Sequence, residues 1–125
     1  MKTREITQSS WADFCNRVRE FSQGSMVSIE LQQPDGSTAN IARDVPLREI
    51  ALDDKTDPCN TNLVIEAGTH NPVRHVVVEP IHIRLRHDGT GERYNQVQIV
   101  AENGVTTVVF RPGLSPETLP GLRVQ

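Results

Sequence analysis

Three basic side chains, His82, Arg84 and Arg86, have the clearest potential for chemistry, because they alternate with apolar residues over positions 81–86. Successive side chains of a β-strand point to opposite faces, so this spacing places all three on one face. Such a strip can bind phosphate or carboxylate groups through charge-assisted hydrogen bonds. The same pattern is also typical of the solvated face of an antiparallel sheet, where acids at positions 79, 88 and 92 would neutralise it. The three residues are the candidate ligand-binding set, and both interpretations stay open.

Nucleic acid is a possible ligand for this strip, but the composition argues against it. The chain has 13 Lys and Arg against 16 Asp and Glu, a net charge of -3, whereas nucleic-acid-binding domains carry a basic surplus. Base stacking also needs accessible aromatic side chains, and only Tyr94 and Phe110 lie outside the aromatic-rich segment 10–23. We therefore do not expect nucleic acid to be the partner.

Four histidines and an acidic segment are the candidate metal ligands. His70, His75, His82 and His87 would have to be brought together by neighbouring strands, since no HExxH motif is present. The acids at positions 53, 54 and 57 lack the glycine and the terminal glutamate of a calcium-binding loop. We expect scattered histidines, solvated loop acids, no metal and no cofactor.

The two cysteines offer little for nucleophilic catalysis. Cys59 follows Pro58 in a polar stretch, and no Gly-x-Ser-x-Gly elbow accompanies it. Cys15 belongs to an apolar helical stripe, where cysteine behaves as a small core residue. With no CxxC pair, neither a disulfide nor a cysteine zinc site is supported. The sequence therefore predicts no catalytic residue.

The elements that position these residues begin with one amphipathic helix over residues 10–23. Its apolar residues recur at intervals of three and four, which is the helical period, and Gly24 supplies the stop. The stripe comprises Trp11, Phe14, Cys15, Val18 and Phe21. Because it carries most of the aromatic side chains, this face must pack on a sheet.

After the helix the period changes to two, which predicts short strands joined by turns. Residues 26–32 and 37–44 form a hairpin, with the second strand at an edge and broken at 45–47 by Pro46. A polar loop covers 48–61. The strands at 62–67 and 74–79 are expected to be central because of the valines at 76–78, and Pro80 marks a sharp corner before 81–86. The pair Asn103-Gly104 predicts a type I′ hairpin between 97–101 and 105–110.

Length and composition limit the fold class. The 125 residues fit one domain at 1–111 followed by a Pro-rich surface tail at 112–125. No apolar run is long enough for a membrane span, and residues 1–6 lack the apolar core of a secretory signal, so we expect a cytoplasmic protein. The pattern predicts a mainly β (α+β) fold: a helix followed by about six to seven antiparallel strands in a small SH3-like or Sm-like barrel or a strongly bent sheet.

Several of these segments resemble a family of small bacterial proteins whose function is unknown. The resemblance rests on Thr3-Arg4-Glu5-Ile6, on the aromatic residues of the helix, and on Glu79-Pro80-Ile81-His82-Ile83-Arg84-Leu85. It implies a bacterial origin and a single cytosolic domain, and it supplies no catalytic residues.

Three hypotheses for function remain. The first is a non-enzymatic binding or assembly module that self-associates or binds a protein partner through a sheet edge, with residues 37–44 as the candidate contact. The second is anion or nucleic-acid binding through His82, Arg84 and Arg86. The third is a small metal-dependent enzyme that uses the histidines. The missing catalytic motifs favour the first.

Overall fold

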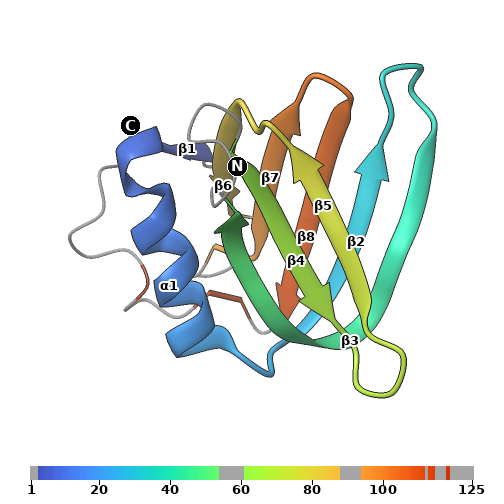
Figure 1. The fold of residues 1–125 in the computed structure, drawn as a ribbon. Helices are drawn as coiled ribbons and strands as arrows, with labels where there is room; N and C mark the ends of the chain where they lie inside the picture. Colours follow the sequence, from blue (N-terminus) through green and yellow to red (C-terminus); the bar gives the residue numbers. More distant parts are fainter. Residues whose placement is uncertain (1–2, 54–60, 88–93, 112, 115–117, 119–125) are drawn as a thin grey trace.

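A computed structural model describes residues 3–53, 61–87, 94–111, 113, 114 and 118 of the chain. One helix and a bent antiparallel sheet make up this part of the protein (Figure 1). The elements in chain order are β1 (Thr3–Ile6), a 3-10 turn (Gln8–Ser10), α1 (Trp11–Ser22), β2 (Met26–Gln32), β3 (Thr38–Asp53), β4 (Asn62–Ala67), β5 (Val73–Val78), β6 (His82–Arg86), β7 (Gln96–Ala101) and β8 (Gly104–Arg111).

The described strands form a single sheet in the order β1-β6-β7-β8-β2-β3-β4-β5. The sheet folds over itself, so that β4, β5 and the end of β3 form a layer in front of β6, β7 and β8 (Figure 1). The expected mainly β fold with one N-terminal helix is confirmed. The sheet is open rather than a closed barrel, because β1 and β5 lie at opposite ends of the strand order. The prediction of six to seven strands missed β1.

The bend is built into β3. Residues 38–46 pair with β2, whereas residues 47–53 pair with β4. Near the end of the first half Asp44 adopts φ 51°, a left-handed conformation that is uncommon outside glycine, and the pairing with β2 shifts register there. The predicted break at 45–47 is therefore a bend within a continuous strand. The predicted polar loop 48–61 was wrong over 48–53, which are strand, and its residues 54–60 lie outside the described part of the chain.

The helix closes the open side of the bent sheet and contacts β3 (Figure 1). Trp11 is 3% exposed, and its Nε1 donates a hydrogen bond to the carbonyl oxygen of Ile6 at 2.9 Å. The predicted helix is confirmed with one correction, since Phe21 is 40% exposed and Ser22 is buried in its place. No helix among the described residues is long and apolar enough to cross a membrane.

Two further predictions change at the end of the chain and at β5. Leu114 and Thr118, described residues of the expected surface tail 112–125, are buried, and the Leu114 amide donates to the Tyr94 carbonyl at 2.8 Å. The tail is therefore not a surface segment at these positions. The corner at Pro80 is confirmed, with Glu79 at φ 49°. The expectation that 74–79 is central was wrong, because β5 ends the sheet.

Candidate interaction edge

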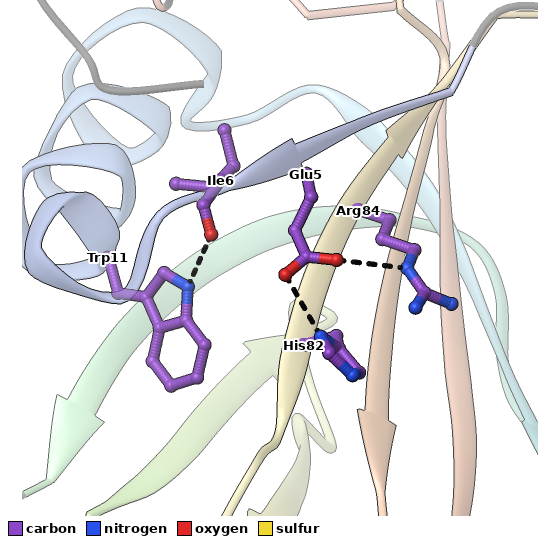
Figure 2. Close-up of polar contacts among 5 residues, drawn as sticks. All are labelled: Glu5, Ile6, Trp11, His82 and Arg84. Atoms are coloured by element: carbon purple, nitrogen blue, oxygen red, sulfur yellow. Dashed lines mark hydrogen bonds and ion pairs between the residues drawn. The ribbon is translucent and has the colours of Figure 1, made fainter. Parts of the chain in front are cut away.

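The predicted basic strip on β6 faces a carboxylate from the neighbouring strand. His82 Nδ1 lies 2.9 Å from Glu5 Oε2, and Arg84 Nε lies 3.3 Å from Glu5 Oε1 (Figure 2). Glu5 is the register partner of Arg84 on β1, so the strand pairing itself brings the three together. The hydrogen bonds from His82 and then from Arg84 lower the pKa of Glu5 below its ordinary value. Sequence reasoning missed Glu5 because it lies 77 residues away along the chain.

The strip is therefore a partly neutralised surface. Two of its three members share one carboxylate, and Arg86 is itself engaged in a further contact. The acids at positions 88 and 92 lie outside the described residues, and the Glu79 carboxylate makes no ion pair with any described residue. An anion would have to displace Glu5 from His82 and Arg84, which weakens this surface as an anion site.

The four histidines lie in separate environments. His75 points inward from β5, with Nε2 2.9 Å from Thr106 Oγ1 on β8, and burial lowers its pKa. His82 binds Glu5, His87 packs edge-on against the Tyr94 ring with centroids 5.7 Å apart, and His70 is exposed after β4. Within the described ranges, no three His, Cys, Asp or Glu side chains are grouped to hold a metal ion.

Of the two cysteines, the structure describes Cys15, and its burial argues against a role as a nucleophile. Cys15 is 1% exposed on the buried side of α1, and burial raises the pKa of its thiol to about 12. Because the thiolate is the reactive form, burial disfavours reaction at Cys15. Cys59 lies outside the described residues.

A polar groove that the sequence did not reveal lies between α1 and the strands β3 and β4. Its volume is about 1080 Å³, and a second cavity of about 510 Å³ shares Arg19, Glu49 and Glu66 with it. Glu49 and Glu66 are register partners on adjacent strands, and Arg19 Nη1 lies 3.5 Å from Glu49 Oε1. Because this lining carries both charge signs, it does not select strongly for one kind of ion.

The sheet edges are the remaining candidate. Four described strand segments pair with a neighbour on one side only, and three of them are protected against pairing with another chain. Unpaired edges invite pairing with other chains, and proteins protect them with short strands, charges, bulges or a covering helix. Among the described segments, β1 has only four residues, two of them charged. Residues 47–53 of β3 lie beside α1. Residues 38–44, the edge expected from the sequence, have register shifts with β2 and end in Arg43 and Asp44, the latter held by Arg111 at 2.6 Å.

The fourth segment, β5, has one charged residue, Arg74, but no bulge and no covering helix among the described residues. It pairs with β4 over six residues without a register shift. Val77 is buried, whereas Val76 and Val78 are 41% and 49% exposed on the opposite face, and Ile81 just beyond the strand is 54% exposed. The His75 contact with Thr106 fixes the strand against the other layer. The sequence did not indicate this edge because a run of valines is equally typical of a strand buried on both faces.

Comparisons with known proteins complete this description. Neither the curated proteins nor the solved structures contain a match to the chain. A family model does match it, over residues 2–120, which is nearly its whole length. The match agrees with the resemblance found in the strand and helix residues. The chain therefore belongs to the family of unknown function DUF5335.

Proposed function

We propose that the protein is a non-enzymatic binding module that takes an extended segment of a protein partner onto the free edge of β5. The observation that carries the proposal is the contrast between β5 and the other described edges. β5 is regular and has two exposed valines, Val76 and Val78, on its outer face after Arg74, whereas the other described edges are short, bulged or covered by α1.

The chemistry of such an edge defines its ligand. Every second residue of β5 directs its backbone N–H and C=O away from β4, and another extended backbone can replace water along such a row of groups. The side chains of Val76 and Val78 then favour apolar residues at alternate positions of the incoming segment. The ligand is thus an extended peptide with alternating apolar residues.

A selection experiment with the full chain tests this proposal. Phage-displayed heptapeptides are selected on the immobilised protein, and binding of the enriched peptides is measured by fluorescence anisotropy. We expect enrichment of alternating apolar patterns, loss of binding in Val76→Lys, and retention in Asn40→Lys, which places the same charge on the 38–44 edge. Alternate N-methylation of a selected peptide should abolish its binding because the edge reads backbone groups.

Two results would overturn the proposal. One is the absence of any enriched peptide when the immobilised protein is a single chain. The other is a set of peptides that bind wild type and Val76→Lys equally, which would place the site elsewhere. Circular dichroism of both variants confirms that the fold is retained, as expected for substitutions of exposed residues.

A further inference from the structure

The free edge of β5 carries opposite charges at its two ends. Arg74 lies near its start and Glu79 directly after its end, and both side chains are exposed. Neither makes an ion pair with any described residue. The exposed Val76 and Val78 lie between them. An antiparallel copy of the same edge would set each charged end against its opposite.

We propose that the segment bound at β5 is β5 of a second copy of this chain, in an antiparallel pair with Val76 on the two-fold axis. The inference rests on the proposed function and identifies its partner. It extends the layer formed by β3, β4 and β5 into the corresponding layer of the second copy.

The register follows from the side chains. Directly opposite residues of an antiparallel pair lie on the same face, so a symmetric pair must centre on one residue. An axis at Arg74 opposes two guanidinium groups, and an axis at His75 opposes two imidazoles. An axis at Val76 opposes two exposed valines and keeps the ladder within β5. It also places Arg74 opposite Val78 of the second copy, next to Glu79 of that copy.

Symmetry favours this pair over other contacts between copies. A β5 to β5 contact uses the same patch on both molecules and closes after two copies. A contact between β5 and residues 38–44 would leave one edge of each kind free in a pair and would add further copies until a ring closes or a filament forms. It would also require pairing with the bulged end at Asp44. The symmetric pair therefore covers residues 74–78 of β5 in both copies at once.

Charge exchange combined with mass measurement tests the dimer. Light scattering after size-exclusion chromatography should give twice the chain mass of 13.9 kDa, falling to the single mass on dilution. Arg74→Glu and Glu79→Arg each place like charges together twice across the axis, so each should weaken the dimer about tenfold. The double exchange should restore wild-type dissociation within about threefold. Arg48→Glu, an equal charge change at another exposed arginine, should have no effect.

The outcomes separate this inference from the proposed function. A single-chain mass at the highest concentration, together with peptide binding that Val76→Lys abolishes, would overturn the second copy and leave the edge as a peptide site. A dimer whose dissociation constant is unchanged by both Arg74→Glu and Glu79→Arg would overturn the β5 register. A double exchange no tighter than the single variants would do the same.

Discussion

At Gly104 a single added methyl group should strongly lower the free energy of unfolding. The residue opens β8 at φ 145°, and a Cβ built there would lie 2.6 Å from the backbone oxygen of Gln32 and 3.1 Å from Leu31 Cδ1. The oxygen belongs to β2, which is paired with β8, so it cannot rotate away. Backbone strain contributes about 1–3 kcal/mol and the overpacking a similar amount. We expect Gly104→Ala to lower the free energy of unfolding by about 4 kcal/mol.

Gly36 provides the matched control. It also lies in a hairpin turn with positive φ, 92°, but nothing lies within 4 Å of its added Cβ. Gly36→Ala should therefore cost only the conformational strain, about 1 kcal/mol. Urea unfolding followed by Trp11 fluorescence measures both variants, with an unchanged m-value as the check on comparability. Equal losses in the two variants would refute the close approach of Gly104 to β2.

Two further predictions concern the interior. Burial lowers the pKa of His75, so the native state binds fewer protons than the unfolded chain. The free energy of unfolding should therefore fall as the pH drops below about 6.5. His75→Gln should flatten this pH dependence in urea titrations from pH 7.5 to 5.5. An unchanged slope in the variant would exclude His75 as the source. Trp11→Ala should lower the free energy of unfolding by about 3–5 kcal/mol. Trp11→Phe retains most of the packing but leaves the Ile6 carbonyl without its donor, so it should lower the free energy of unfolding by about 1–3 kcal/mol. Circular dichroism is the probe for both variants because the chain has a single Trp. Equal costs would show that the hydrogen bond dominates.

The helix was predictable because a 3.6-residue period is a local property of the sequence. The error at Phe21 is also a matter of helix geometry. The buried positions 11, 14, 15, 18 and 22 spread over about 100° of the helix surface, and position 21 lies about 20° outside this arc, next to Phe14. Residue type suggested burial of Phe21, but the docking direction of the helix decides which residue lies under it.

The strand at 47–53 was not predictable because bulges interrupt its period. The register shifts between Leu47 and Glu49, so inward residues do not alternate regularly with polar ones. The hairpin at 101–104 was predicted, yet Ala101 pairs with Gly104 and the turn begins one residue earlier than the Asn-Gly pair suggested. Positive φ occurs at Gly104 but not at Asn103, which excludes the type I′ turn.

The environment of the basic strip on β6 was the least predictable feature because it depends on which strands are neighbours. Glu5 reaches His82 and Arg84 only because β1 returns to pair with β6. This pairing gives two of the three basic side chains a shared carboxylate partner.

The valine run of β5 illustrates the same point for the sheet edge. Its composition suits a central strand, and its position at the end of the strand order leaves Val76 and Val78 exposed. A strand whose sequence is suited to the interior gains stability when another strand covers it. The discrepancy between the sequence of β5 and its place in the single chain is resolved when a second strand completes the sheet.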